Sequence, residues 1–323
     1  MSEAPAEPVI AIVVPCYNEE AVLPEIKARL SAKIGQLVSG GKIGKGSFIC
    51  FVDDGSCDKT WELILQYHKD DPELINGIKL SANCGHQNAL LCGLLSLKDR
   101  ADALISMDAD LQDDVDAIDK MAEEFSNGSE IVYGVRSGRA KDSFLKRTAA
   151  RAFNRLMAFF GVDIVSDHAD FRLMGKKALA ALSQYGEVNL FLRGIVPRLG
   201  FKSAVVYYQR SERFAGHSKY PLHKMLELAL DGITSFSLRP IRMIALLGVF
   251  IFTLSLALLV FFLALYFSGQ SMALWAALLT SLIGMGGLIL FSIGLVGEYI
   301  GKIYLETKRR PRYHIEEILT AWE

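Results

Sequence analysis

The residues best suited to chemistry lie in four clusters of acidic and amide side chains, each directly after a short apolar run. The clusters are Pro15-Cys-Tyr17-Asn18-Glu19-Glu20, Asp53-Asp54-Gly55-Ser56, Ser81-Ala-Asn83-Cys-Gly85-His86 and Asp108-Ala-Asp110-Leu-Gln112-Asp113. Asp108 and Asp110 project to the same side of an extended chain, and Gln112 continues that side if the chain stays extended. Paired carboxylates with an amide oxygen suit a hard cation that completes its shell with water and substrate phosphates. We therefore predict an Mg²⁺ or Mn²⁺ site at Asp108, Asp110 and Gln112.

The Asp-x-Asp pattern also has a second interpretation. Such a pattern is common by chance and often caps a helix, which here would be the helix expected near Val115. Its position after an apolar run, together with the acidic pair Asp53 and Asp54 after another such run, favours the metal site.

Alternating strands and helices are the elements that must position these clusters. Strands are predicted at residues 9–14, 48–52, 77–80, 103–107 and 131–133, with helices at 21–37, 60–68, 87–97 and 115–125. This alternation predicts an α/β fold with a mostly parallel, doubly wound sheet. Ligands of such sheets bind outside the carboxyl ends of the strands, so the four clusters are expected to converge on one crevice.

The charges divide the chain of 323 residues into distinct segments, although its formal net charge is only −1. Residues 1–134 carry 11 basic and 23 acidic side chains, whereas residues 135–242 carry 19 basic and 8 acidic ones. Residues 243–297 carry no Asp, Glu, Lys or Arg at all. A hydrophobic fraction of 51% excludes a disordered chain, and nothing in the sequence predicts a nucleic-acid partner.

The uncharged segment is long enough for two transmembrane helices, because one span needs about 20 apolar residues. A polar break at 268–271 divides it into helices at 241–267 and about 273–300. The other interpretation is a buried helical hairpin in a soluble protein. Positive residues precede the first helix and follow the second, and no signal peptide is recognisable, so the catalytic part and both termini are expected in the cytoplasm. Two helices alone bury little surface, which makes a homo-oligomer plausible.

Seven motifs in order make the sequence resemble the family 2 inverting glycosyltransferases. The four clusters are followed by Tyr133-Gly-x-Arg136, Asp167-x-x-Asp170-Phe-Arg172-Leu and Arg213-x-x-Gly-x-Ser-Lys219-Tyr. The most similar branch is the polyprenyl-phosphate sugar transferases, namely the bactoprenol glucosyltransferases, with dolichyl-phosphate mannose synthases more distant. The resemblance covers nearly the whole chain and implies a Rossmann-like GT-A domain at residues 1–218. A juxtamembrane region at 219–240, two transmembrane helices at 241–300 and a cytosolic tail at 301–323 would follow it.

The resemblance also implies a role for each site residue. It places a nucleotide sugar at the first three clusters and at the start of the fourth, and the acceptor phosphate at the basic residues. The nucleotide-sugar residues would be Pro15, Tyr17, Asn18, Glu19, Asp53, Asp54, Asn83, Gly85 and Asp108. The acceptor-phosphate ligands would be Arg136, Arg172, Arg213 and Lys219. Asp113-Asp114 departs from the Asp-Pro of relatives, which we expect to affect only the start of the next helix.

The catalytic residues implied by the resemblance are Asp170, Asp110 and Arg136, with Asp170 nearest the reacting centre. Two roles remain open for Asp170. It is either a general base or a structural carboxylate that orients Arg172 or Arg136. A lipid phosphate has a second pKa near ~6, so it is already largely an anionic nucleophile at neutral pH and a strong base is unnecessary.

The basic residues of segment 135–242 have an expected partner in the anionic lipid of the cytoplasmic leaflet. Residues 220–237 have an amphipathic pattern that predicts an interfacial helix, although an ordinary helix packed on the domain fits the same pattern.

The sequence therefore predicts a membrane-anchored enzyme that transfers one hexose from a nucleotide sugar to polyprenyl phosphate with inversion. Glucose from UDP-glucose is the first donor suggested by the resemblance. UDP-linked N-acetylglucosamine, galactose or an aminoarabinose derivative, and GDP-mannose, are alternatives. A processive polysaccharide synthase is disfavoured, because its Q-x-x-R-W motif is absent. A non-catalytic nucleotide-sugar sensor is a further alternative.

Overall fold

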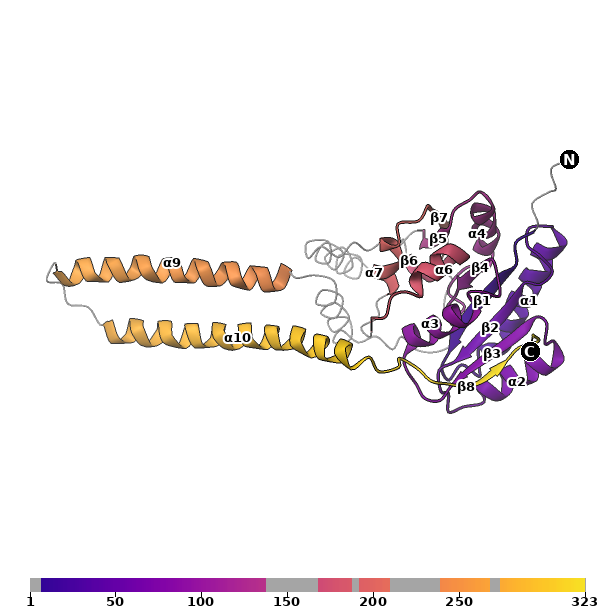
Figure 1. The fold of residues 1–323 in the computed structure, drawn as a ribbon, viewed down its shortest axis with the longest axis horizontal. Helices are drawn as coiled ribbons and strands as arrows, with labels where there is room; N and C mark the ends of the chain where they lie inside the picture. Colours follow the sequence, from indigo (N-terminus) through magenta and orange to yellow (C-terminus); the bar gives the residue numbers. More distant parts are fainter. Residues whose placement is uncertain (1–6, 138–167, 188–191, 210–238, 268–273, 323) are drawn as a thin grey trace. The chain divides into compact units, whose positions relative to one another are not determined.

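The computed structural model describes residues 7–137, 168–187, 192–209, 239–267 and 274–322, which form two compact units (Figure 1). The first unit is an α/β sheet with its helices and includes the end of the chain from Arg310 onwards. The second contains two long helices. The predicted interfacial helix at 220–237 and the polar break at 268–271 lie outside the described residues.

An eight-stranded sheet forms the centre of the first unit, with the strand order β7-β5-β6-β4-β1-β2-β3-β8. All strands except β6 and β8 run in the same direction, which confirms the predicted mostly parallel sheet. The strand bounds are β1 Ile10–Cys16, β2 Phe48–Asp53, β3 Ile75–Leu80, β4 Ala103–Ser106, β5 Ile131–Arg136, β6 His168–Gly175, β7 Ser203–Tyr208 and β8 Ile315–Leu319.

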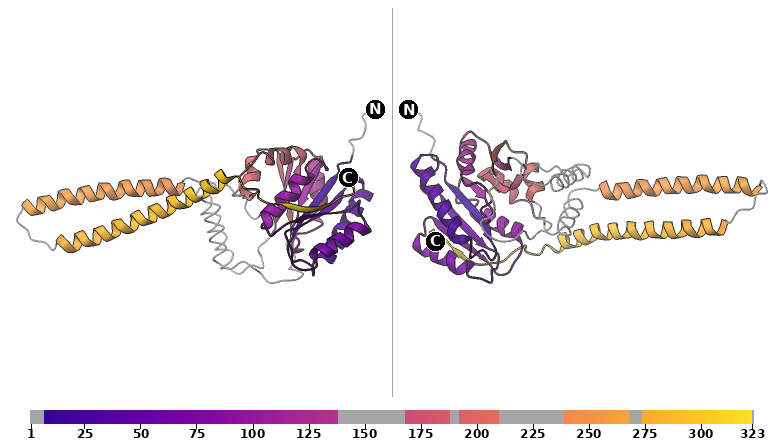
Figure 2. Two further views of the ribbon diagram at one scale, coloured as in Figure 1. Left: turned by 60° about the horizontal axis from the view of Figure 1, so that its bottom comes forward. Right: turned by 180° about the vertical axis from the view of Figure 1, so that it is seen from behind.

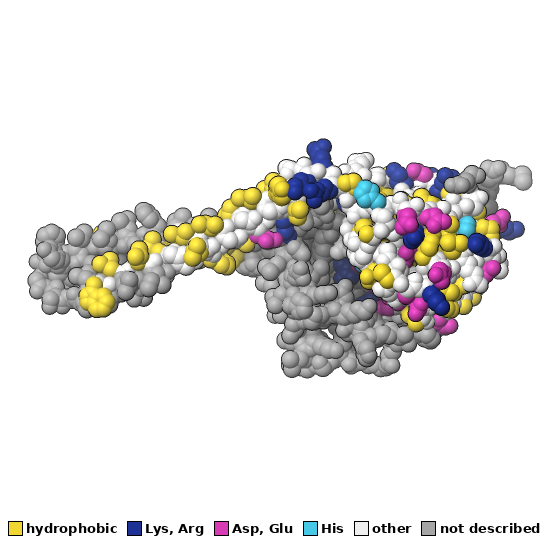
Figure 3. Space-filling model, turned by 90° about the horizontal axis from the view of Figure 1, so that it is seen from below, with side chains coloured by type: hydrophobic (Ala, Val, Ile, Leu, Met, Phe, Trp, Pro, Cys, Tyr) yellow, Lys and Arg dark blue, Asp and Glu magenta, His cyan; other side chains and the backbone are white. Residues whose placement is uncertain are grey.

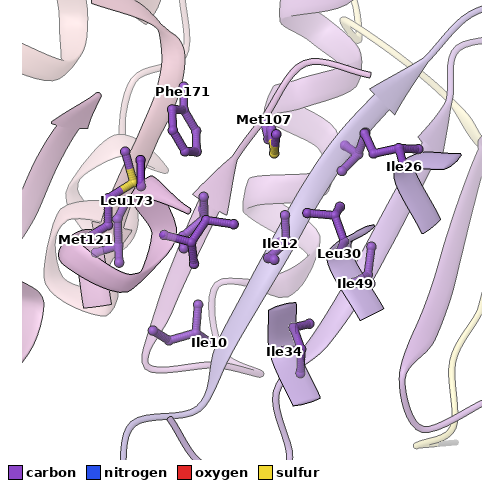
Figure 4. Packing of buried hydrophobic residues seen from close by; sticks show 14 of the residues in the cluster. Ile10, Ile12, Ile26, Leu30, Ile34, Ile49, Met107, Met121, Phe171 and Leu173 are labelled. Atoms are coloured by element: carbon purple, nitrogen blue, oxygen red, sulfur yellow. The ribbon is translucent and has the colours of Figure 1, made fainter. Parts of the chain in front are cut away.

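Helices cover both faces of this sheet (Figure 2). The helices of this unit are α1 Leu23–Ser39, α2 Thr60–Asp70, α3 His86–Leu97, α4 Ala117–Ser126, α6 Lys176–Leu182 and α7 Leu192–Arg198. The apolar side of α1 packs Ile26 and Leu30 over Ile12 of β1, where the main core lies (Figure 4). Successive strand residues point to opposite faces, so Val13, which packs against α3, places that helix on the other face.

Close packing of α3 on the sheet depends on Gly93. A Cβ atom at this position would lie 2.4 Å from Cγ1 of Val13 and 2.8 Å from Cγ2 of Val52. Because overpacking of this kind typically costs about 1–3 kcal/mol, we expect Gly93→Ala to lower the free energy of unfolding by that amount and to push α3 away from the sheet.

Urea unfolding in detergent measures this effect, with Gly35→Ala as the matched control. A Cβ at Gly35, in the middle of α1, meets nothing within 4 Å, so alanine there should stabilise by about 0.5–1 kcal/mol through helix propensity. Equal unfolding free energies for the two variants would show that Gly93 does not set the approach of α3.

The end of the chain forms an edge strand of the same sheet, where the sequence predicted only a cytosolic tail. Strand β8 pairs antiparallel with β3, and Lys79 binds Glu316 at 2.9 Å. Trp322 packs on Phe48 with ring centroids 4.8 Å apart. The nitrogen of Ser81, at the carboxyl end of β3, donates to the carbonyl of His314 at 3.0 Å. The C-terminal segment therefore supports the start of the loop that carries Asn83 and Gly85.

The second unit contains two long helices, α9 Arg239–Phe267 and α10 Leu274–Lys308, in the region where the sequence predicted two transmembrane helices. In the part of the chain that the structure describes, one segment, Gly284–Lys308, is long and apolar enough to cross a membrane. The mean hydropathy of its most apolar 18-residue stretch is 1.6, and only 6% of that stretch is buried. Hydrophobic side chains are exposed along α10, among them Leu282 and Ile293 (Figure 3).

Candidate active site

Hydrogen bonds and ion pairs connect the ends of the first four strands one to the next. Asn18 Oδ1 after β1 accepts from the nitrogen of Cys57 after β2 at 2.8 Å. The carboxylate of Asp54 then reaches the loop after β3, and His86 in turn reaches Asp108 after β4. The predicted convergence of the four clusters at the carboxyl ends of the strands is therefore present in the structure.

The residues after β1 differ in what they present to the site. Pro15 is buried within β1, where it pairs with Val52, whereas Tyr17 is 40% exposed. Asn18 has a φ of 53°, a left-handed conformation that asparagine tolerates better than most residues. Its own nitrogen donates to Ser56 Oγ at 2.9 Å, and the nitrogen of Glu19 donates to Thr60 Oγ1 at 2.9 Å. Asn18 and the backbone of Glu19 thus join this loop to the second cluster, and the side chain of Tyr17 is exposed.

Asp53 and Asp54 are both buried and accept hydrogen bonds from different loops. Asp53 accepts from the nitrogen of Ser56, and burial raises its pKa in spite of that hydrogen bond. Asp54 accepts from the nitrogens of Cys84 at 2.7 Å and Gly85 at 3.0 Å. Asp54 therefore fixes the loop after β3, and with it the exposed side chain of Asn83.

Gly55 allows this loop to pack closely against the second cluster. Its φ is 68°, and a Cβ atom would lie 2.7 Å from the backbone of Ala82 and Asn83. Only glycine fits at such a position. A Cβ atom would clash with this backbone, and a positive φ is unfavourable for residues that have a side chain.

The predicted metal ligands follow β4, but the chain turns where the sequence analysis considered an extended path. Leu111 has a φ of 56°, and the nitrogen of Gln112 donates to Asp110 Oδ1 at 3.2 Å. Gln112 is 8% exposed, and the side chain of Asp108 is 27% exposed. The turn arises because the aspartate side chain bonds the backbone two residues on, which competes with the extended conformation.

The chemistry of these residues fits a divalent cation. Burial raises the pKa of Asp108 to about 6; His86 opposes the shift, and the carboxylates of Asp113, Asp170 and Asp110 add to it. A cation would relieve the repulsion among these carboxylates. No group of three His, Cys, Asp or Glu residues suited to a metal occurs among the described residues, so water and substrate oxygens would supply the remaining ligands.

The raised pKa of Asp108 makes cation binding sensitive to pH. A cation binds the ionised carboxylate, so protonation of Asp108 competes with it. We expect the affinity for Mn²⁺ to be nearly constant above pH 7 and to fall by up to about tenfold per unit below pH 6. Titration of the full-length protein with Mn²⁺, followed by electron paramagnetic resonance between pH 5 and 8, measures this. An affinity independent of pH over that range would contradict the assignment of Asp108.

Arg136, at the end of β5, is held by Asp113, a member of the fourth cluster to which the sequence analysis gave no role, and by Tyr208, which it did not select. Its Nη2 lies 3.3 Å from Oδ1 of Asp113, and its Nε donates to the hydroxyl of Tyr208 at 3.2 Å. Tyr208 also donates to Asp113. Asp113 is 2% exposed, and these contacts place its carboxylate next to Arg136. The guanidinium of Arg136 remains 29% exposed.

Asp170, on β6, lies among three cationic or imidazole side chains. Its Oδ1 is 2.6 Å from Nη2 of Arg172, and its Oδ2 is 3.1 Å from Nη2 of Arg193 and 3.7 Å from Nε2 of His86. The hydroxyl of Ser106 donates to its backbone carbonyl. Burial raises the pKa of Asp170, but the two guanidinium groups and His86 outweigh burial and hold it well below its usual range.

His86 and Arg193 are therefore site residues that the sequence analysis missed. His86 Nε2 lies 3.3 Å from Oδ1 of Asp108 and 3.7 Å from Oδ2 of Asp170, and thereby connects these two carboxylates. His86 belongs to a cluster that the sequence analysis identified, whereas Arg193 was grouped with the residues facing lipid. Arg213 and Lys219 lie outside the described residues.

Comparison with known proteins gives a family match and relatives of nearly the same length. The model of Glycosyl transferase family 2 matches residues 11–183. An uncharacterized glycosyltransferase of Bacillus subtilis (strain 168), YkoT, is 50% identical over 96% of this chain and 92% of its own. The bactoprenol glucosyl transferase of Shigella phage SfX is 36% identical over 95% of this chain and 98% of its own. Glucosyl-3-phosphoglycerate synthase from Mycobacterium tuberculosis, crystallised with Mn²⁺, UDP and phosphoglyceric acid, has 17% identity and a TM-score of 0.45 over 70% of this chain and 76% of its own.

Proposed function

The chain belongs to glycosyl transferase family 2, and from that premise we propose that it transfers one hexose, glucose from UDP-glucose, to a polyprenyl phosphate. Its catalytic unit has the GT-A, Rossmann-like α/β fold with a mostly parallel sheet. The observation that carries the proposal is the 36% identity to a bactoprenol glucosyl transferase over 95% of the chain. The lipid acceptor of that relative is also consistent with the long apolar helices of this protein.

The donor would bind at the carboxyl ends of β1 to β4, where the four clusters meet. Tyr17 and Asn83 present exposed side chains there, and the buried Asp53 lies between them in the strand order. Asp108, Asp110 and Gln112 would hold Mg²⁺ or Mn²⁺. When bound, the cation supplies Lewis-acid stabilisation of the negative charge that develops on the departing nucleoside diphosphate.

The acceptor needs little activation, and Asp170 is poorly suited to provide it. A phosphate monoester is largely ionised at neutral pH, because its second pKa is near ~6. Asp170 is paired with Arg172 and Arg193, and its pKa is held well below the usual range, so it would accept a proton weakly. We therefore assign Asp170 the orienting role, with Arg193 as a partner in addition to the predicted Arg172. A single displacement by the acceptor phosphate would invert the anomeric carbon.

The two long helices support a location at the cytoplasmic face of the membrane. Gly284–Lys308 meets the criteria for a span, and α9 is 29 residues long with no charge beyond Arg242. Arg239 and Arg242 precede the hairpin, and Lys308, Arg309 and Arg310 follow it. With basic residues on both flanks, we propose two spans with the catalytic unit in the cytoplasm.

The experiment that tests this function uses purified full-length protein, undecaprenyl phosphate and Mn²⁺ with a panel of labelled nucleotide sugars. Label from UDP-glucose should enter the organic phase as a lipid-linked monosaccharide of inverted configuration. Preferential transfer from UDP-N-acetylglucosamine, UDP-galactose, a UDP-aminoarabinose derivative or GDP-mannose would contradict the proposed donor but support the proposed transfer to a lipid phosphate. Binding of the donors without transfer to any lipid phosphate would contradict the enzyme assignment.

A further inference from the structure

Arg193 is a partly exposed residue that is anchored by the carboxylate of Asp170. Its Nη2 lies 3.1 Å from Oδ2 of Asp170, and its Nε lies 3.4 Å from Oδ1. The two contacts approximate the bidentate pairing that fixes a guanidinium in one plane. The side chain of Arg193 nevertheless remains 39% exposed.

The neighbouring Arg172 differs from Arg193 in accessibility. Arg172 is 1% exposed and donates to Asp170 at 2.6 Å and to the carbonyl of Leu192 at 3.5 Å. Arg172 therefore stabilises the charge of Asp170 from within the core. Its bond to Leu192 also connects β6 to the start of α7, where Arg193 is the next residue. Of the two guanidinium groups bound to Asp170, only that of Arg193 can reach a ligand without rearrangement of the core.

The surroundings of Arg193 indicate the kind of ligand it would meet. Asp170, the partner of Arg193, is connected through His86 to Asp108, one of the proposed metal ligands. Arg193 therefore lies near the proposed metal site. The Nη1 nitrogen of Arg193 has no hydrogen-bond partner among the described residues. A guanidinium already held on one edge loses less conformational freedom when its other edge binds an anion, and its planar fork matches phosphate oxygens.

We propose that Arg193, held in place by Asp170, binds a phosphate group of a substrate; this inference rests on the proposed transfer to a lipid phosphate. Both substrates carry that chemistry, the donor as a diphosphate and the acceptor as a monoester. Asp170 is then a positioning residue that acts through Arg193. The family resemblance implied that Arg172 binds phosphate, and we assign that role to Arg193 instead.

Two binding measurements on the full-length protein in detergent separate the two phosphate sources. One titrates UDP in the presence of Mn²⁺, and the other titrates a short-chain polyprenyl phosphate, each by calorimetry. Loss of a charge-assisted contact is expected to weaken one of these affinities about 10- to 100-fold in Arg193→Gln. Weaker UDP binding would assign the donor diphosphate, and weaker lipid-phosphate binding would assign the acceptor. Arg193→Lys should restore part of the loss, because it keeps the charge but not the fork.

Arg198→Gln, on the same helix, is the matched control, because it removes the same charge from an exposed position and should leave both affinities unchanged. Both affinities within twofold of wild type in Arg193→Gln and in Arg193→Lys would overturn the proposal. If the glutamine variant does not fold, the lysine variant decides alone. A wild-type protein that binds both ligands but transfers no sugar would contradict the proposed function and still leave the Arg193 comparison decisive.

Discussion

Replacing Asp110 with alanine should abolish metal-dependent sugar transfer while leaving the fold and membrane insertion intact. Asp110 lies at the turn after β4, where its carboxylate accepts from the nitrogen of Gln112 and lies within the carboxylate cluster around Asp108. Removal of a metal ligand should cost roughly 4 kcal/mol of transition-state stabilisation, which is about a 10³-fold loss in kcat/KM. Initial rates of lipid-linked sugar formation at saturating Mn²⁺ measure this.

The control for this variant is Asp114→Ala, which removes the same charge from the same loop. The side chain of Asp114 accepts from the nitrogen of Asp116 at 2.9 Å, so its loss should cost about 1 kcal/mol of stability and leave the rate within about twofold of wild type. Wild-type activity of Asp110→Ala, or equal activities of Asp110→Ala and Asp114→Ala, would contradict the assignment of Asp110 as a metal ligand.

The second large effect is expected for Asp170→Asn. The substitution keeps the shape of the side chain but leaves the buried guanidinium of Arg172 without its counter-charge. Breaking a buried pair in this way typically costs about 3–5 kcal/mol. Because the pKa of Asp170 is depressed, its stabilising charge is present at all pH values above the ordinary range of a carboxyl group and is lost only in strong acid. Urea unfolding at pH 7, compared with wild type, measures the loss.

The same variant distinguishes a positioning carboxylate from a general base. If Asp170 acts through Arg193, the losses of activity in Asp170→Asn and Arg193→Gln should not add in the double variant, since both remove one contact. The pH dependence of kcat should also keep its shape, because no proton passes through Asp170. Additive losses, together with the disappearance of one limb of the pH profile, would instead identify Asp170 as the base.

The sequence predicted the elements whose patterns are local. The runs at 48–52 and 103–107 are close to β2 and β4, because buried parallel strands are continuous apolar segments between polar loops. Helix α3 begins at His86, one residue before the predicted start. The clusters after these strands were also correctly brought together, because parallel strands place their carboxyl ends at one edge.

Contacts between distant residues were not predictable in the same way. Tyr208 and Asp113 are 95 residues apart, and no periodicity in the sequence relates them. Strand β8 has an exposed pattern with two glutamates and pairs with β3 from the far end of the chain, so it lacks the apolar signal of a strand. Arg193 was assigned to lipid because charge alone does not show that a carboxylate lies 3.1 Å away.

The central claim, transfer of a hexose to a polyprenyl phosphate, is tested most directly by one assay of the purified full-length protein. Labelled UDP-glucose, undecaprenyl phosphate and Mn²⁺ are incubated together, and label in the organic phase is compared with the UDP released. We expect equal amounts of lipid-linked glucose and UDP, and neither product when the cation is chelated. Release of UDP without label in the lipid, or lipid labelling that is unchanged by chelation, would contradict it.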